Sequence, residues 1–254
     1  MNAFRFRRTC RSAFVSAILI SPALLFSAGN CQGQAGPGSS RNRYVVSVQD
    51  LKMASKGHAA FDKGSQLLEK GDALGSIAYL QRAIAEYPEH YKAYYDLGVA
   101  HFRLAQEAEA EQAFQTAIDL TKGNFAPPQF GLGAILCQKA EFTQAVTLLQ
   151  RALELEPGSA VGKYYLGWAQ FGLNRLVEAE QSLEQALLRK ANFAEAYLLL
   201  ARIHQRQRNM PAALRDLESY LKIEPRKELA KRLADQIQRE LTQDAAMVAT
   251  TAQP

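Results

Sequence analysis

The chain has 254 residues, of which 48% are hydrophobic, and a formal net charge of +5. Four of its 30 basic residues lie within residues 1–30, which contain no acidic residue, so the rest carries 26 basic against 25 acidic residues. A charge so close to zero argues against a general phosphate-binding surface, and therefore against a nucleic-acid partner.

Residues 1–30 have the parts of a secretory signal peptide. A basic start precedes an apolar run over residues 12–28, which Pro22 interrupts, and small residues then suit cleavage near Gly29 or Ala35. The run is shorter than the ~20 apolar residues of a membrane-spanning helix, which favours a cleaved signal peptide. An uncleaved membrane anchor is the alternative. We therefore expect an extracytoplasmic protein, either periplasmic or secreted.

Residues 31–54 are predicted to be a flexible linker. Residues 32–43 are rich in Gly, Ser, Gln and Pro, and the β-prone residues 44–48 are expected to lie extended against the first folded unit. Cys31 follows the apolar run, where bacterial lipoproteins carry an acylated cysteine. Asn30 stands where such a signal needs a small residue, so lipidation of Cys31 is a second alternative for membrane attachment.

A pattern of small residues recurs five times between residues 57 and 225. The small residue at Gly133 recurs at spacings of 34, 35, 34 and 34 residues, and Ala145 recurs in step with it. Small side chains suit places where two helix axes approach closely, and proline suits helix ends. Each copy predicts two short helices that cannot bury their apolar faces alone. The positions are Gly64, Gly98, Gly133, Gly167 and Ala201, then Ser76, Ala110, Ala145, Ala179 and Ala213, and the prolines Pro88, Pro157 and Pro225.

This pattern resembles the tetratricopeptide repeat, and the resemblance covers about two thirds of the chain. It implies an all-α fold, a right-handed α-solenoid over residues 55–225, in which the first helix of each pair lines a concave face that binds a partner. The five expected repeats are 57–90, 91–125, 126–159, 160–193 and 194–225.

The chain after Pro225 predicts a capping helix over residues 226–241. Apolar residues recur there every four positions and would cover the open side of the last repeat. They are Leu229, Leu233, Ile237 and Leu241. Residues 242–254 are small and polar and are predicted to be a disordered tail.

The sequence contains no motif for catalysis or for a cofactor. Gly131 and Gly133 lack the third glycine of a dinucleotide site, and there is no phosphate loop, HExxH, G-x-S-x-G or paired CxxC. His101 and His204 occupy an apolar position of the repeat and are interpreted as packing residues. Cys137 is interpreted as a free buried thiol. We therefore expect no enzyme activity, no cofactor, no metal and no small-molecule substrate.

The resemblance also indicates which side chains face the concave groove. It implies that the residue after the first large position of each first helix does so, and most of these residues are aromatic. They are Phe61, Tyr95, Phe130, Tyr164 and Leu198, followed one to two turns later by Val99, Phe102, Ala134, Trp168 and Phe171. The prediction is an aromatic binding groove. The alternative is that these rings pack between neighbouring helices.

Arginines give this groove a basic end in the fifth copy. Arg202 and Arg206 lie one turn apart, with Arg208 nearby, and could pair with an acidic residue or with the terminal carboxylate of a bound segment. The alternative is a solvated helix surface. Family members that clamp chaperone carboxylates use Lys and Asn at set positions, which here hold Phe61, Ser65, Asp96, Pro127 and Gly131. That ligand is therefore not expected.

Together these observations predict an extracytoplasmic scaffold that binds a protein or peptide segment in a concave aromatic groove. Two alternatives remain open. One is an assembly or accessory factor for an envelope complex such as a pilus, secretion or outer-membrane machinery, and the other is a non-catalytic partner of a separate enzyme chain. Membrane contact is expected only through the signal segment or a lipidated Cys31.

Overall fold

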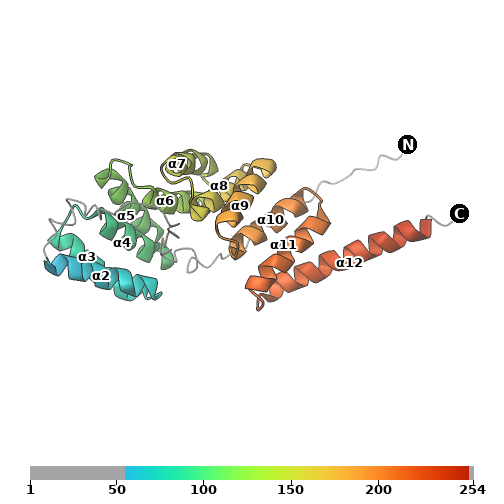
Figure 1. Ribbon diagram of the computed structural model, residues 1–254, viewed down its shortest axis with the longest axis horizontal. Coiled ribbons are helices and arrows are strands. Elements are labelled where there is room, and N and C mark those ends of the chain that lie inside the picture. Colours follow the sequence, from blue (N-terminus) through green and yellow to red (C-terminus); the bar gives the residue numbers. More distant parts are fainter. Residues whose placement is uncertain (1–54, 252–254) are drawn as a thin grey trace, which may run out of the picture.

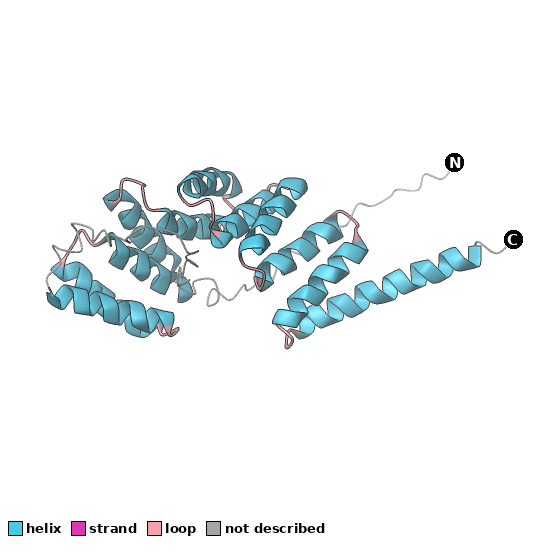
Figure 2. Cartoon of the chain, viewed as in Figure 1, coloured by secondary structure: helices cyan, strands magenta, loops and turns pink. Residues whose placement is uncertain are grey.

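The computed structural model describes residues 55–251, and this part consists of helices joined by short turns (Figure 1 and Figure 2). The predicted signal peptide, the linker and Cys31 lie outside the described residues. The helices are α2 (Ser55–Glu69), α3 (Ala73–Glu86), α4 (Tyr91–Arg103), α5 (Glu107–Leu120), α6 (Ala126–Gln138), α7 (Phe142–Leu155), α8 (Ala160–Gly172), α9 (Leu176–Arg189), α10 (Ala194–Arg206), α11 (Met210–Ile223) and α12 (Glu228–Thr251).

Successive helices pack as antiparallel pairs, which follow one another along an arc (Figure 1). The first helices of neighbouring pairs touch one another directly, from α2 through α4, α6 and α8 to α10, whereas the second helices of neighbouring pairs do not. A row of first helices in mutual contact must form the inner, tighter side of a curved array. The predicted all-α solenoid of five helix pairs is thereby confirmed.

The recurring small residues lie where the two helices of a pair touch. A Cβ atom added to Gly133 would lie 2.5 Å from Leu149 Cδ2, and one added to Gly98 would lie 2.6 Å from the Phe114 ring. In both pairs the large residue follows the glycine by 16 positions, and the same spacing joins Gly64 to Leu80 and Gly167 to Leu183. Each glycine therefore admits one large core side chain from the second helix.

The turn inside each pair is built around one residue with a positive φ angle. Gly71 occupies this position in the first pair, but later pairs use non-glycine residues, including Ala105 at 56° and Ala140 at 59°. In the second pair, the amide of Gln106 donates to the carbonyl of His101, which closes the end of α4. The left-handed residues are Gly71, Ala105, Ala140, Asn174 and Arg208.

Helix α12 covers the last pair and extends beyond it (Figure 1). Ala230, Ala234 and Ile237 are buried against α11, while Leu229 is 82% exposed and so lies off the packed face on which we expected it. The helix continues to Thr251, so the prediction of a disordered tail from Thr242 is wrong for residues 242–251. Alanine, glutamine and methionine after Leu241 have a high intrinsic helix propensity, which favours this continuation.

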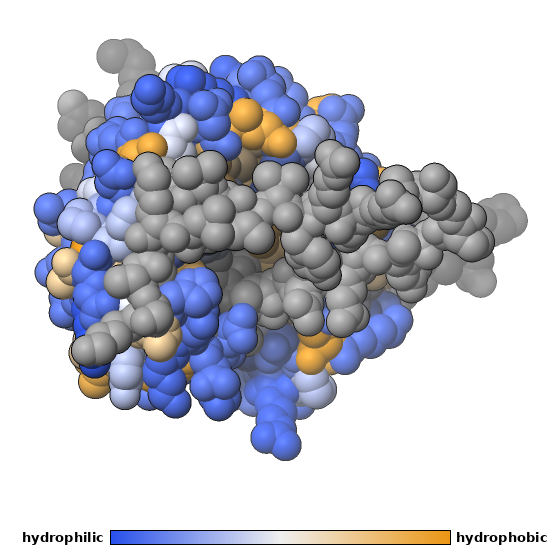
Figure 3. Space-filling model, turned by 60° about the vertical axis from the view of Figure 1, so that its left-hand side comes forward, coloured by the Kyte–Doolittle hydropathy of each residue, from blue (hydrophilic) through white to orange (hydrophobic). Residues whose placement is uncertain are grey.

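No helix in residues 55–251 combines the length and apolar character needed to cross a bilayer. The face of the molecule in Figure 3 is mainly hydrophilic where described residues form it, with small, separate hydrophobic patches. On this face, the described residues therefore form no broad apolar surface.

Candidate functional site

A small pocket opens between the first helices of the fourth and fifth pairs, α8 and α10. Its volume is about 60 Å³, which corresponds to the space of about four to six water molecules. Its walls are mainly aromatic and aliphatic, with one acidic and one basic side chain. The lining residues are Tyr164, Trp168 and Phe171 from α8, and Glu195, Leu198, Leu199 and Arg202 from α10.

The lining residues converge because they share one face of each helix. Trp168 follows Tyr164 by four residues and Phe171 follows Trp168 by three, which brings the three rings onto one stripe of α8. Along α10, Leu198 and Arg202 are also four residues apart. Five of the predicted groove residues are thus brought together in one pocket, namely Tyr164, Trp168, Phe171, Leu198 and Arg202.

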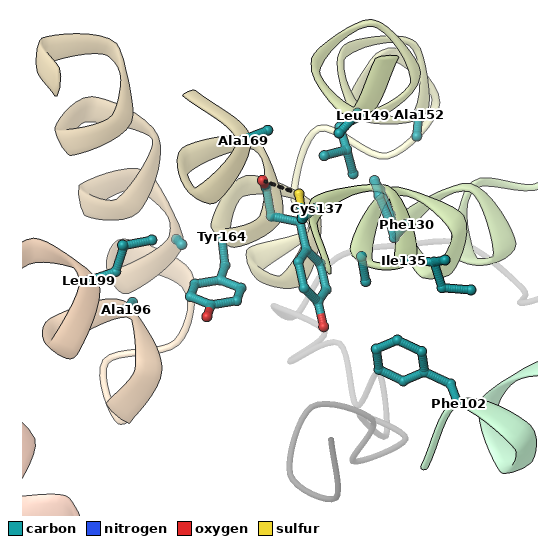
Figure 4. Close-up of a cluster of buried hydrophobic side chains, with 14 of the residues drawn as sticks. Phe102, Phe130, Ile135, Cys137, Leu149, Ala152, Tyr164, Ala169, Ala196 and Leu199 are labelled. Carbon is teal, nitrogen blue, oxygen red and sulfur yellow. Dashed lines mark hydrogen bonds between the residues drawn. The ribbon is translucent and has the colours of Figure 1, made fainter. Parts of the chain in front are cut away.

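Tyr164 forms the buried base of this pocket. Its side chain is 1% exposed, its ring centroid lies 4.8 Å from that of Phe193, and it points from α8 towards Leu199 of α10 (Figure 4). Trp168 and Phe171 are only partly buried. Tyr164 is therefore a core residue with one edge on the pocket, which corrects the prediction that it stands open on the groove. The rings of Trp168 and Phe171 provide the accessible aromatic surface.

The rim near the end of α10 is positively charged. The guanidinium of Arg206 lies 4.2 Å from the centroid of the Phe171 ring, and Arg202 is half-buried beside the pocket. Burial lowers the pKa of Arg202, and the charge of nearby Arg206 adds to this effect. Among the described residues, no carboxylate forms an ion pair with either arginine. Two cations thus flank an apolar hollow without an ion-pair partner from the described part of the chain.

Glu195 lines the opposite end of the same pocket. It precedes Arg202 by seven residues, about two helical turns, so the two residues lie on one side of α10 with backbone positions about 10 Å apart along the helix axis. The sequence reasoning did not single out Glu195 or Leu199. The helical period could have suggested both, but only the packing of α10 against α8 shows that they reach the hollow.

The predicted groove residues of the first three pairs do not form a comparable pocket. Phe102 and Phe130 are each 3% exposed and belong to the buried core. The Phe130 ring fits against Gly162 at the start of α8, where a Cβ would lie 2.5 Å away. Phe102 and Phe130 therefore lie in the core rather than on an open groove, and Gly162 leaves room for the Phe130 ring.

Of the other predicted groove residues, Val99 and Ala134 are buried in the core, whereas Phe61 and Tyr95 are partly buried among other rings. The Phe61 ring centroid lies 4.5 Å from that of His90, and Tyr95 lies 5.8 Å from Phe125 and 6.1 Å from Phe114. Burial raises the pKa of Tyr95. These aromatic contacts show that both rings contribute to packing between successive pairs.

A polar cluster that sequence reasoning missed joins α9, α10 and α11. His204 Nδ1 lies 2.6 Å from Asp216 Oδ2, and its Nε2 lies 3.1 Å from Glu180 Oε1. Gln207 donates to the other oxygen of Glu180 at 3.1 Å. Burial alone would lower the pKa of His204, but hydrogen bonds to Asp216 and Glu180 raise it on balance. His204 is therefore not simply an apolar packing residue, and its ring connects two helix pairs through Glu180 and Asp216.

Cys137 is a free, buried thiol, as the sequence suggested. Burial raises its pKa to about 12, and its sulfur lies 3.6 Å from the Tyr165 carbonyl, to which the thiol donates (Figure 4). A protonated thiol in this setting is a poor nucleophile. The part of the chain that the structure describes contains no group of three or more His, Cys, Asp or Glu side chains suited to a metal ion.

Comparisons with known proteins agree with this architecture. Two family models, both described as tetratricopeptide repeat, match residues 61–125 and residues 138–203 respectively. Tetratricopeptide repeat protein 16 of Macaca fascicularis is 22% identical over 211 residues, which cover 80% of this chain and 24% of that protein. The chain therefore spans about a quarter of the length of this curated relative.

Solved structures share the fold at low sequence identity. PilF of Pseudomonas aeruginosa has a TM-score of 0.64 at 17% identity, and the match covers 77% of this chain and 88% of that one. YrrB, a tetratricopeptide repeat protein with an unusual peptide-binding site, has a TM-score of 0.52 at 20% identity, with coverage of 69% and 90%. At these identities the likeness shows a shared helical solenoid.

Proposed function

Because the chain belongs to the tetratricopeptide repeat family, we propose that it is a non-catalytic scaffold that binds a protein or peptide segment between α8 and α10. The main observation in support is the pocket itself, in which the accessible rings of Trp168 and Phe171 lie beside Leu198 and the half-buried Arg202. Aromatic rings and arginine are the side chains that most often dominate protein interfaces. Rigid rings also lose little conformational entropy on binding.

The fold supports this proposal in two further ways. The first helices form the inner row of the solenoid, so a segment bound there contacts more than one repeat. YrrB, a protein of the same fold, has a peptide-binding site. Among the predicted groove residues, only those of the fourth and fifth pairs lie around the pocket, which makes this end the best-supported binding surface.

We further propose that the protein acts outside the cytoplasm. The basic start, the apolar run over residues 12–28 and the small residues that follow support export through a signal peptide. N-terminal sequencing of the exported protein tests this proposal, with an expected mature start between Asn30 and Gly36. Recovery of intact Met1 in a membrane fraction would contradict cleavage, and a lipid-modified Cys31 would place the protein on a membrane.

Site-specific photo-crosslinking tests the binding function. A photoreactive phenylalanine analogue at Leu198, which lines the pocket, should form a covalent adduct with another protein in cells that produce this chain. The same analogue at Leu188 is the matched control, because Leu188 is 84% exposed but lies on the second helix of its pair. Equal adducts from both positions, or none from Leu198, would argue against a partner in this pocket.

A further inference from the structure

We propose that the pocket binds one apolar side chain of a peptide that carries a carboxylate on the Arg202 side and a basic residue on the Glu195 side. This proposal rests on the proposed function, since it specifies the chemistry of the partner at the same site. The proposal specifies the order of charges on either side of the apolar residue that enters the pocket, which we call the anchor.

The size and lining of the pocket limit the anchor to one apolar side chain. A volume of about 60 Å³ between Trp168, Phe171 and Leu198 suits a side chain rather than a folded surface. Most of the lining is apolar, so a polar side chain would lose its hydration without gaining hydrogen bonds there. An aliphatic or aromatic residue avoids this cost and removes apolar surface from water.

The charge of Arg202 specifies an anion beside the anchor. Arg202 is half-buried, the positive charge of Arg206 lies one turn away, and no carboxylate of the described residues pairs with either. The neighbouring Tyr164 hydroxyl cannot supply the counter-charge, because burial raises the pKa of Tyr164 and keeps it neutral. A partner carboxylate would meet the planar guanidinium with charge-assisted hydrogen bonds, and the exposed Arg206 could add a second contact.

Glu195 determines the polarity of the bound segment. It lies on the same face of α10 as Arg202, about 10 Å away along the helix. An extended peptide spans about 3.3–3.6 Å per residue, so this separation corresponds to about three residues. A peptide with its acidic and basic residues exchanged would place like charges together at both ends of the pocket. Such repulsion discriminates between partners more strongly than the apolar anchor can.

A random linear peptide library displayed on phage is a suitable probe. The wild-type protein should enrich peptides with an apolar residue, an acidic residue beside it and a basic residue about three positions from the acid. The double variant Arg202→Glu, Arg206→Glu should instead enrich a basic residue at the position of the acid. Arg232→Glu combined with Arg239→Glu on α12 is the matched control, because both residues are exposed and distant in sequence from the pocket.

A synthetic peptide from the wild-type selection provides the quantitative measurement. Arg202→Gln should weaken its binding by about tenfold to a hundredfold, the range typical of losing a charged hydrogen bond. Circular dichroism of each variant checks that the helices remain folded. Replacing the acidic residue of the peptide with phosphoserine should not improve binding, since a marked gain would identify a phosphate site and overturn the assignment of a carboxylate.

The outcomes separate this proposal from the proposed function. The charge order would be overturned if the wild-type protein enriched apolar peptides without any charge preference. It would also be overturned if the preference for an acidic residue survived in the double variant of Arg202 and Arg206. Either result would leave peptide binding itself intact. Absence of any enrichment relative to a Leu198→Gln variant would instead argue against peptide binding in the pocket. In that case both the proposed function and the proposal that rests on it would fail.

Discussion

The guanidinium of Arg206 lies 4.2 Å from the centroid of the Phe171 ring. The two residues belong to different helix pairs, since Phe171 is on α8 and Arg206 is on α10. A cation held over an aromatic face is stabilised by the ring quadrupole. The contact therefore keeps a positive charge at the rim of the pocket, close to the ring stripe that also contains Trp168.

This arrangement predicts that Trp168 fluorescence is quenched more strongly by iodide than by caesium. Trp168 is the only tryptophan, partly exposed beside Arg202 and Arg206, whose charges attract anions. The difference between quenching by iodide and quenching by caesium should shrink in the double variant Arg202→Gln, Arg206→Gln and at high salt. Glu195→Gln should enlarge it, because the opposing negative charge is removed. Equal quenching of the wild-type protein by both ions would show that the rim is not electropositive.

Gly133→Ala should destabilise the solenoid by about 1–3 kcal/mol through overpacking. The added Cβ would lie 2.5 Å from Leu149 Cδ2, so α6 and α7 would have to separate or Leu149 would have to move. Gly158→Ala is the matched control, because a Cβ there meets no atom within 4 Å. Urea unfolding measures the free energy of unfolding of both variants. A Gly133→Ala protein as stable as the control would mean that this helix contact is looser than described.

Ala140→Gly should stabilise the protein, although glycine usually weakens structure. Ala140 has a φ of 59°, and an L-residue in this region costs about 1–2 kcal/mol. Glycine removes that strain and loses about 0.5–1 kcal/mol in conformational entropy, which leaves a net gain of up to about 1.5 kcal/mol. Ala108→Gly, on the exposed face of α5, should lose about 0.5–1 kcal/mol. Thermal unfolding should shift these two variants in opposite directions.

Tyr165→Phe should leave the protein as stable as wild type or more stable, by about 1 kcal/mol or more. Tyr165 is fully buried, and its hydroxyl has no hydrogen-bond partner among the described residues. Removing an unsatisfied buried hydroxyl removes the cost of its lost hydration. Tyr79→Phe, at a residue that is 39% exposed, should change the stability by less than about 0.5 kcal/mol. Clear destabilisation by Tyr165→Phe would reveal a partner for the hydroxyl.

His204 should make the stability depend on pH. Its folded-state pKa is raised on balance by Asp216 and Glu180, against the effect of burial. The charged ring therefore stabilises the fold fully below the unfolded pKa of about 6.5, and this contribution is lost as pH rises through the folded pKa. The melting temperature should fall between about pH 6 and pH 8. His204→Gln, which cannot titrate, should melt at a temperature that varies less over this range.

The helix pairs were predictable because their signal is local and repeated. Gly133 and its counterparts mark the closest approach of two helices that are adjacent in sequence, and the large core partner follows at a constant 16 positions. The turns at Ala105 and Ala140 recur at the same point of each repeat, although alanine is a weak turn residue. The residues that form a pair are thus determined by neighbours within one repeat.

The end of the chain shows a limit of this reasoning. The small and polar residues after Leu241 suggested a disordered tail, yet α12 continues to Thr251. Alanine, glutamine and methionine have high intrinsic helix propensity, so a helix already held by Ala234 and Ile237 against α11 can continue past its last packing contact. A segment without core residues can therefore still be helical when its intrinsic helix propensity is high.

Only the tertiary structure decided which aromatic residues face the pocket and which belong to the core. Phe130 and Trp168 both lie on first helices, but Phe130 fits against Gly162 of the next pair, whereas Trp168 remains partly exposed beside α10. The contact of His204 with Asp216 and Glu180 likewise joins residues from three helices. The repeat pattern of the sequence determined the solenoid. Exposure and charge pairing depend on side-chain volumes in neighbouring repeats, so the packing of α8 against α10 determined the site.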